Sequence, residues 1–313
     1  MAGMIVRTPR RARRPARLLV LALAATALLA ACAGGSRNAG AAGQSQRPSE
    51  AEEPAVTAEP VHPAFTVTLP ELEARLAATA AELRPAFAER FAPRILERPE
   101  YFLELLRQSF DEPQELFRLV DKEHALPEDY APEDLVDLNR YADRLILNRN
   151  DLSLRAIIMP DLFAMIEAAR LDGILIDISS TYRSYQYQAG LFERHVQNLG
   201  REQAERVSAR PGTSQHQLGT TVDFGSITPA FADTRAGRWL AANSRDFGFS
   251  LSYPDGYEEL TGYSYEPWHF RYISRVGTEL ETQFFEGLQQ HLLEFYRANA
   301  EWFRARLRDG GAS

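Results

Sequence analysis

Hydrophobic residues recur at helical spacing in four stretches of the chain, residues 70–121, 160–170, 184–199 and 278–307. Spacing of three and four predicts helices with one apolar face. Pro85 and Pro93 interrupt the first stretch, which therefore predicts several short helices, with Thr68 or Leu69 as the first cap. Thr278 and Glu281 have the spacing of a capping box, so the last stretch predicts one long helix.

Short runs rich in β-branched and aromatic residues lie between these helices, at residues 174–178, 220–224, 249–253 and 268–273. Such runs predict strands. Because helices and strands follow one another in mixed order, we expect an α+β fold with a small antiparallel sheet flanked by helices. We favour packing of the N-terminal helices against this body over a docking role. For the last helix, we favour such packing over a role at a partner or a membrane surface.

The first 63 residues have a different texture. An arginine-rich start without acidic residues is followed by an apolar run at residues 18–31, which is typical of a secretory signal peptide. The run ends at Cys32, the only cysteine, in a sequence that resembles the lipobox of bacterial lipoproteins. We expect a signal peptide over residues 1–31, a lipid on Cys32, a flexible tether over 32–63 and an exported protein anchored to the cell envelope. The alternative is an incidental cysteine in a cleaved signal peptide or a membrane anchor segment.

The charge of the chain excludes one class of partner. It carries 35 basic and 43 acidic residues, and without the six leader arginines the net charge is −14. A strongly acidic body argues against nucleic acid, since phosphate binding needs a basic face. The sequence does not indicate an oligomeric state.

Two of the six histidines are accompanied by other residues that bind metals. His62 lies in the expected tether, where we expect solvent around it, and His124, His195 and His291 stand alone. His216 lies in a glycine-containing loop seven residues before Asp223, and His269 follows Glu266-Pro-Trp. Two imidazoles and one carboxylate can hold a zinc ion and leave a position open for water. The competing interpretation is a polar loop with a surface Asp223.

Two further groups complete the candidate chemistry. In a regular strand Glu266 and His269 would face opposite sides, but Pro267 breaks that alternation. Glu266 could then act as general base on a bound water and as acid toward the leaving amine. Arg183, between a strand and a helix, could stabilise an oxyanion or hold a carboxylate, with Gln188 one turn later. Ordinary alternatives are a core histidine with an incidental glutamate and a surface salt bridge for Arg183.

These residues stand in an ordered set of motifs: Tyr182-Arg-Ser with Gln188, Ser214-x-His-x-x-Gly with Asp223, Phe247-Gly-Phe with Tyr253-Pro, Thr261-Gly, and Glu266-Pro-Trp-His-Phe-Arg-Tyr272. Over about residues 120–276 the chain resembles the VanY-type D-alanyl-D-alanine carboxypeptidases. The resemblance implies a hedgehog-like zinc-peptidase fold over residues 122–276. Residues 64–121 are then a helical N-terminal segment, and residues 277–313 a helical extension.

The resemblance also implies roles. His216, Asp223 and His269 would bind Zn²⁺, Glu266 would be the catalytic base and Arg183 would stabilise the oxyanion. The residues that it implies for substrate binding are Gln188, Ser214, Ser180 and Trp268. The implied reaction is removal of a terminal D-alanine from peptidoglycan stem peptides, at a D,D or an L,D bond. The alternatives are a peptidoglycan endopeptidase and a non-catalytic wall-binding lipoprotein on the same fold. Two positions depart from the family pattern, Thr221 and Ser252, where the family often has alanine and a basic residue.

Overall fold

The chain divides into two units, residues 1–55 and 56–313. A computed structural model describes residues 58–308, all in the second unit. The predicted signal peptide, the lipid site at Cys32 and most of the predicted tether lie outside the described residues. Among the helices of residues 58–308, none combines the length and the apolar character that crossing a bilayer requires.

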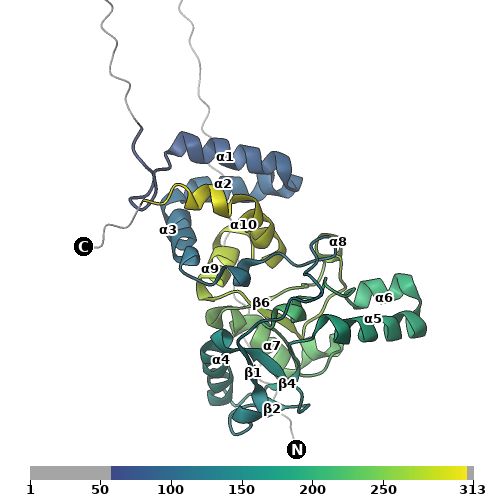
Figure 1. Ribbon diagram of the computed structural model, residues 1–313. Helices are drawn as coiled ribbons and strands as arrows, with labels where there is room; N and C mark the ends of the chain where they lie inside the picture. The colour runs from purple at the N-terminus through teal and green to yellow at the C-terminus, as the bar shows by residue number, and fades with distance from the viewer. Residues whose placement is uncertain (1–57, 309–313) are drawn as a thin grey trace, which may run out of the picture. The chain divides into compact units, whose positions relative to one another are not determined.

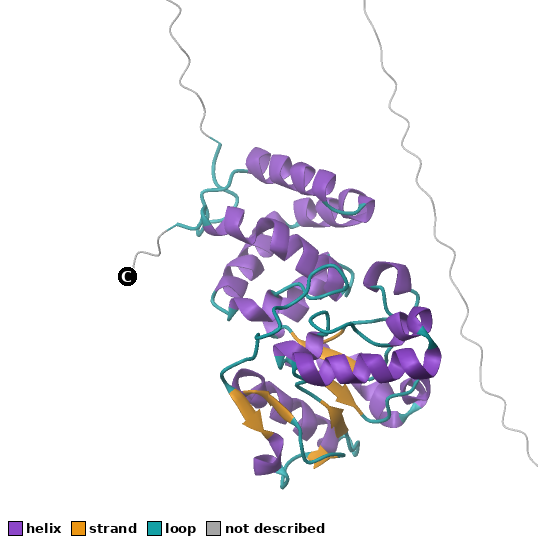
Figure 2. Cartoon of the chain, turned by 45° about the vertical axis from the view of Figure 1, so that its right-hand side comes forward, coloured by secondary structure: helices purple, strands orange, loops and turns teal. Residues whose placement is uncertain are grey.

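Helices and short strands alternate along the described chain (Figures 1 and 2). The α-helices are α1 (Leu69–Glu82), α2 (Ala92–Glu97), α3 (Pro99–Phe110), α4 (Met159–Leu171), α5 (Tyr185–Leu199), α6 (Arg201–Val207), α7 (Arg235–Asn243), α8 (Glu258–Thr261), α9 (Arg275–Phe284) and α10 (Gln289–Arg304). The strands are β1 (Leu135–Asp137), β2 (Ile146–Leu147), β3 (Ser153–Arg155), β4 (Asp177–Ser180), β5 (Thr221–Phe224), β6 (Phe249–Leu251) and β7 (His269–Tyr272).

The central sheet has five strands in the order β2-β4-β5-β7-β6. Its strands β4, β5, β7 and β6 pair in antiparallel fashion, whereas β2 joins the edge in parallel with β4. A separate antiparallel pair joins β1 to β3. The predicted α+β class is confirmed. The predicted small antiparallel sheet is present, and β2 adds a parallel edge strand whose two residues are too few to show a period of two in the sequence.

The helices before and after the sheet region form one layer, which we call the helical layer: α1, α2, α3, α9 and α10. The first and last helices lie side by side (Figure 1), with the Arg75 side chain of α1 donating to Asn299 Oδ1 of α10 at 2.6 Å. The Phe102 ring of α3 meets the rings of Phe284 and Phe295 at 5.1 and 5.6 Å between centroids. These helices also share one apolar core with β5 and β7, so packing against the body, the favoured interpretation of both helical segments, is what the structure has.

Local sequence signals explain where α1 begins. The backbone N–H of Thr68 donates to Glu71 Oε2 at 2.8 Å, which is half of the capping box that threonine and glutamate form at this spacing. The chain is already ordered before this helix, since Val61 N–H donates to the Val67 carbonyl at 2.8 Å. His62, expected in solvent, instead lies 3.1 Å from the Glu104 carboxylate and edge-on to Phe65.

The C-terminal segment differs from its prediction as one long helix. It forms α9 and α10, separated at Glu286 and Gly287, whose φ angles are 56° and 71°. These left-handed conformations cannot continue a right-handed helix. Ser274, not Thr278, caps α9, and its Oγ accepts from Gly277 N–H at 3.2 Å. The capping-box spacing of Thr278 and Glu281 therefore misplaced the start of the helix.

The remaining predicted elements lie close to their expected positions. The stretches at residues 160–170 and 184–199 form α4 and α5, and the run at 220–224 contains β5. The run at 174–178 is shifted, because β4 starts at Asp177. The short elements β1, β2, β3, α6, α7 and α8 were not predicted.

Candidate metal and catalytic site

The pairing of β5 with β7 places two candidate ligands side by side. Asp223 lies directly opposite His269 in the antiparallel ladder. Directly opposed residues present their side chains on the same face of a sheet, with Cβ atoms about 5 Å apart. The alternating residues Val222 and Phe270 belong to the apolar core. Strand register alone thus directs one carboxylate and one imidazole to a common site.

His216 reaches the same point from a turn. It lies in the 3₁₀ turn Gln215–Leu218, just before β5, and Gly219 ends that turn at φ 70°. A Cβ at Gly219 would also come within 3.0 Å of Leu135. Glycine is therefore required both by the backbone conformation and by the space around it. The turn delivers the imidazole beside the end of β5.

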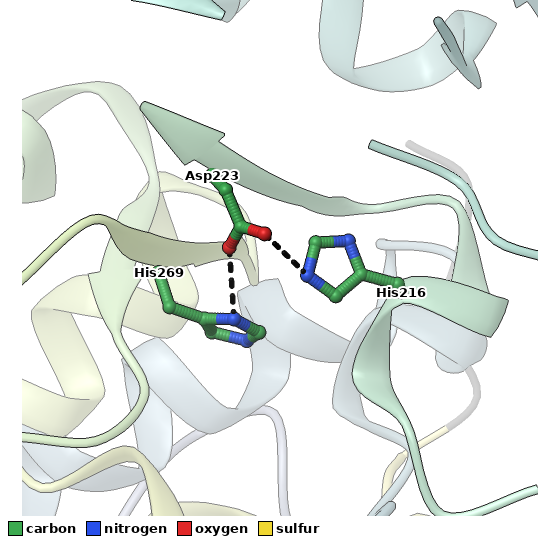
Figure 3. Close-up of side chains that lie close together, drawn as sticks. All are labelled: His216, Asp223 and His269. Carbon is green, nitrogen blue, oxygen red and sulfur yellow. Dashed lines mark ion pairs between the residues drawn. The ribbon is translucent and has the colours of Figure 1, made fainter. Parts of the chain in front are cut away.

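The three side chains converge (Figure 3). Asp223 Oδ2 lies 3.2 Å from His216 Nε2, and Asp223 Oδ1 lies 3.1 Å from His269 Nδ1. Their potential ligand atoms all lie within 4.8 Å of one another, and all three residues are buried. The structure therefore brings together the three residues predicted to bind zinc.

The hydrogen bonds around this group fit a divalent metal. His216 Nδ1 lies 2.6 Å from the Thr181 carbonyl oxygen, which can only accept, so the proton belongs on Nδ1 and the Nε2 lone pair faces Asp223. His216 Nε2 and Asp223 Oδ1 are buried without a hydrogen-bond partner among residues 58–308. Buried polar atoms without partners are rare unless a ligand completes them. Two nitrogens and one carboxylate are a donor set that zinc prefers.

The charges of the site favour metal binding at neutral pH. Burial lowers the pKa of His216 to about 4, and the charge of Arg183 acts in the same direction. Burial raises the pKa of Asp223, but the two histidines outweigh burial and hold it well below its usual range. A neutral imidazole and an ionised carboxylate are the protonation states that bind a metal.

Glu266 lies beside this group. The His269 N–H donates to the Glu266 carbonyl at 3.1 Å, so a tight turn that contains Pro267 precedes β7. Because of this turn, Glu266 and His269 do not face opposite sides as they would in a regular strand. Glu266 Oε2 lies 3.4 Å from His269 Nδ1. Burial and the charge of Asp223 raise the pKa of Glu266 to about 8 in the metal-free site. A carboxyl group with a pKa near neutrality can both accept and return a proton.

Arg183 is the cation of the site. It follows β4 and precedes the Ser184 cap of α5, and its N–H donates to the His216 carbonyl at 3.3 Å. Its Nη2 lies 4.0 Å from Asp223 Oδ2, and its Nε is buried without a partner in the described chain. A guanidinium with an unused donor beside the metal group can interact with a developing negative charge.

A cavity of about 190 Å³ opens onto these groups. Of the residues predicted to bind substrate, Gln188, Ser214 and Trp268 line it, together with Arg183 and Glu266. Gln188 Nε2 donates to the Ala209 carbonyl at 2.7 Å, while its Oε1 is buried without a partner among the described residues. Ser180 does not line this cavity. It lines a neighbouring hollow that shares Arg183, although it lies opposite Asp223 in the pairing of β4 with β5.

Several residues of the site were given no role from the sequence. Tyr253, whose ring lies 4.7 Å from that of His269, lines the cavity with Tyr263 and His195. The Tyr253-Pro254 motif was the available signal for the first. Gln215 contacts His269 Nε2, the ring nitrogen that does not face Asp223, and no sequence pattern indicated this contact. Arg271 is fully buried and donates to the carbonyls of residues 116 and 118, so it supports the helical segment before the sheet.

The comparison with known proteins identifies the family. The family model described as VanY, D-alanyl-D-alanine carboxypeptidase, matches residues 151–275. A D-alanyl-D-alanine carboxypeptidase of Enterococcus faecalis is 32% identical over 205 residues, which cover 62% of this chain and 71% of that protein. The chain belongs to the VanY D-alanyl-D-alanine carboxypeptidase family. The predicted family resemblance is therefore confirmed. The predicted enzyme class, that of carboxypeptidases, is confirmed with it.

Further proteins are similar to parts of this chain. YodJ of Bacillus subtilis, assigned as a carboxypeptidase, is 33% identical over 181 residues, and the match covers 55% of this chain and 65% of YodJ, less than two thirds. The structure of the LdcB LD-carboxypeptidase has a TM-score of 0.51 and 30% identity, and covers 57% of this chain and 86% of that one. A VanY D,D-pentapeptidase solved in complex with Zn(II) has a TM-score of 0.48 and 30% identity, over 57% and 99% of the two chains.

Proposed function

We propose that this protein is a zinc-dependent carboxypeptidase that removes a terminal D-alanine from peptidoglycan stem peptides. The observation that carries the proposal is the convergence of His216, Asp223 and His269 beside Glu266 and Arg183, at the edge of one cavity. Family membership supports the substrate class, since the Enterococcus faecalis relative is named as a D-alanyl-D-alanine carboxypeptidase.

The ligand set has a defined role in this proposal. His216 Nε2, His269 Nδ1 and one oxygen of Asp223 would hold Zn²⁺, because these atoms already lie within 4.8 Å of one another. Bound there with an open coordination position, zinc lowers the pKa of water and polarises a carbonyl group. The Thr181 carbonyl keeps the proton of His216 on the nitrogen that points away from the ion.

The remaining chemistry belongs to protein side chains. Glu266 takes one proton from the attacking water as the new C–O bond forms, and it gives that proton to the amine nitrogen as the C–N bond breaks. Burial raises the pKa of Glu266, which makes its carboxylate a stronger proton acceptor than one in water. Arg183 faces the developing oxyanion, and its burial strengthens the attraction because little water screens it. Gln188 and Ser214, which line the cavity, offer polar contacts to the peptide.

Mass spectrometry of defined stem peptides tests the proposal. The full chain with zinc is incubated with a pentapeptide ending in D-alanyl-D-alanine and, separately, with the tetrapeptide ending in one D-alanine. Loss of a single alanine from the first assigns a D,D bond, and loss from the second an L,D bond. Chelation of zinc should abolish either loss, and restored zinc should return it.

The same assay, extended to cross-linked stem peptides, separates the alternatives. An endopeptidase would release internal fragments from cross-linked stems and leave the terminal alanine in place. A wall-binding module would retain the intact peptide with no cleavage at any zinc concentration. Turnover that persists unchanged after complete removal of zinc would overturn the metal mechanism, even if alanine were released.

For localisation, we propose export and attachment to a membrane of the cell envelope through a lipid on Cys32. Support comes from the sequence alone: the arginine-rich start, the apolar run at residues 18–31 and the position of the single cysteine. Labelling of growing cells with a fatty acid should mark the wild-type protein and fail to mark Cys32→Ser. Equal labelling of both would contradict the proposal.

A further inference from the structure

A glutamine lies behind one of the candidate metal ligands. His269 directs Nδ1 toward Asp223, and its other ring nitrogen is turned away from that carboxylate (Figure 3). This second nitrogen, Nε2, lies 3.3 Å from Gln215 Oε1. A neutral imidazole carries its proton on one nitrogen only, so an acceptor at Nε2 leaves the Nδ1 lone pair available for a metal. The orientation of the Gln215 amide therefore matters for the metal site.

The orientation of Gln215 can be derived from a backbone carbonyl two steps away. The Ser250 carbonyl oxygen, which can only accept, lies 3.5 Å from Gln289 Nε2. This contact places Gln289 Oε1 toward Gln215, whose Nε2 donates to it at 3.2 Å. Gln215 must therefore present Oε1 on its other side, toward His269. The hydroxyl of Ser252 donates to that same oxygen at 2.7 Å, which agrees with the assignment.

Gln289 comes from a part of the chain outside the peptidase match. It is the first residue of α10, whereas the family model matches residues 151–275. Gln289, Gln215 and Ser252 are all buried, so water competes little for these contacts. Ser252 follows β6, in the stretch that pairs with β7. Its hydroxyl takes part in the polar chain.

The next residue of α10 provides a natural comparison. Gln290 is also buried, but its Nε2 donates to Asp121 Oδ2 at 2.9 Å and to Glu294 Oε1 at 3.0 Å. Both of these partners are acidic side chains, and among the described residues Gln290 makes no hydrogen bond with Gln215 or His269. Two adjacent glutamines of one helix thus differ in whether they connect to the metal ligand.

We propose that Gln289, acting through Gln215, is a positioning residue for His269, and that α10 is therefore part of the metal centre. The chain of contacts from the Ser250 carbonyl to His269 fixes the tautomer and ring orientation with which His269 meets the ion. The proposal rests on the metal site of the proposed function, and it concerns zinc affinity in the first place and turnover only as a consequence.

Zinc affinity of the full chain, measured by competition with a chromophoric chelator, tests this. Gln215→Leu, which removes the acceptor, should weaken zinc binding about 10- to 100-fold, as loss of a hydrogen-bond partner of a ligand does. Gln215→Glu keeps an oxygen acceptor and should restore affinity to within about threefold. Gln289→Leu should weaken it by a smaller factor, about three- to tenfold, because it acts through Gln215. Gln290→Leu is the matched control and should leave affinity unchanged while it lowers the melting temperature.

Two outcomes would overturn the inference. One is equal zinc affinity in Gln289→Leu and Gln290→Leu, which would mean that the polar chain only fills space in the core and does not position His269. The other is an unchanged tautomer: in ¹⁵N NMR of the metal-free protein the share of His269 with the proton on Nε2 should be larger in the wild type than in Gln215→Leu, and equal shares would contradict the argument. A wild-type protein that binds no zinc at all would instead overturn the proposed function, so the two failures are distinguishable.

Discussion

The helical layer and the metal site are both buried, but the first consists mainly of apolar side chains and the second of polar ones. In the helical layer the buried side chains are largely apolar, and Phe102 is surrounded by the rings of Phe284, Phe295 and Phe303. In the metal site, His216 Nε2, Asp223 Oδ1 and Arg183 Nε are buried without hydrogen-bond partners in the described chain. Burial of polar atoms without partners costs stability, whereas burial of apolar rings contributes it. One region stabilises the fold, and the other is held ready for a ligand.

The largest effect expected from this comparison is on turnover. Glu266→Gln removes the proton acceptor and should lower kcat about 10²- to 10⁴-fold, while zinc remains bound. The metal-free variant should melt no lower than the wild type, because burial already disfavours the ionised form of Glu266, whose pKa is about 8. Peptide hydrolysis, zinc content and calorimetry measure the three quantities. A marked loss of stability would show that this carboxylate supports the fold, and the contrast between the regions would fail.

Phe102→Ala tests the other region. Loss of a fully buried phenylalanine should lower the free energy of unfolding by about 3–5 kcal/mol, which denaturant titration measures. Phe163→Ala, at a partly buried ring of α4, is the control and should have a smaller effect. At temperatures where both variants are folded, zinc affinity should equal that of the wild type. A drop in affinity confined to Phe102→Ala would mean that packing in the helical layer is coupled to the ligands.

The smallest effect expected is a pH dependence of the metal-free protein. The folded-state pKa of His216 is about 4, below its ordinary value of 6.5, because burial disfavours the charged ring. Between these pH values the unfolded chain binds a proton that the folded chain does not, so stability falls as pH falls from 6.5 to about 4. Melting temperatures of chelator-treated wild type and His216→Asn should converge over this window. Parallel curves would contradict the assignment of a buried neutral imidazole.

Much of the site was predictable because its residues occur in short motifs. The distance from His216 to Asp223 spans one glycine-ended turn and one short strand, so local chemistry brings the two close. The register that sets Asp223 opposite His269 joins residues 46 positions apart, and no pattern in the sequence predicted it, although metal chemistry and the family resemblance both grouped the two residues. Ser180 lies opposite Asp223 in the sheet yet lines a neighbouring hollow, a difference that no sequence pattern indicated.

Other features left no signal in the sequence. The strands β1, β2 and β3 have two or three residues each, too few for an alternating pattern to appear. The break between α9 and α10 depends on a glutamate in a left-handed conformation, which composition does not reveal. The contact between Gln215 and Gln289 spans 74 positions and joins two uncharged amides, a residue type common on any surface. Pairs of this kind become visible only when the backbone is folded.

The break at Glu286 and Gly287 has a consequence for where the enzyme is considered to end. A polypeptide cut after residue 284 would retain every proposed zinc ligand, Glu266 and all residues that the family model matches. It would nevertheless lack Gln289 and the rings of Phe295 and Phe303 that enclose Phe102. The segment that homology identifies is thus shorter than the smallest segment of this chain that we expect to be active.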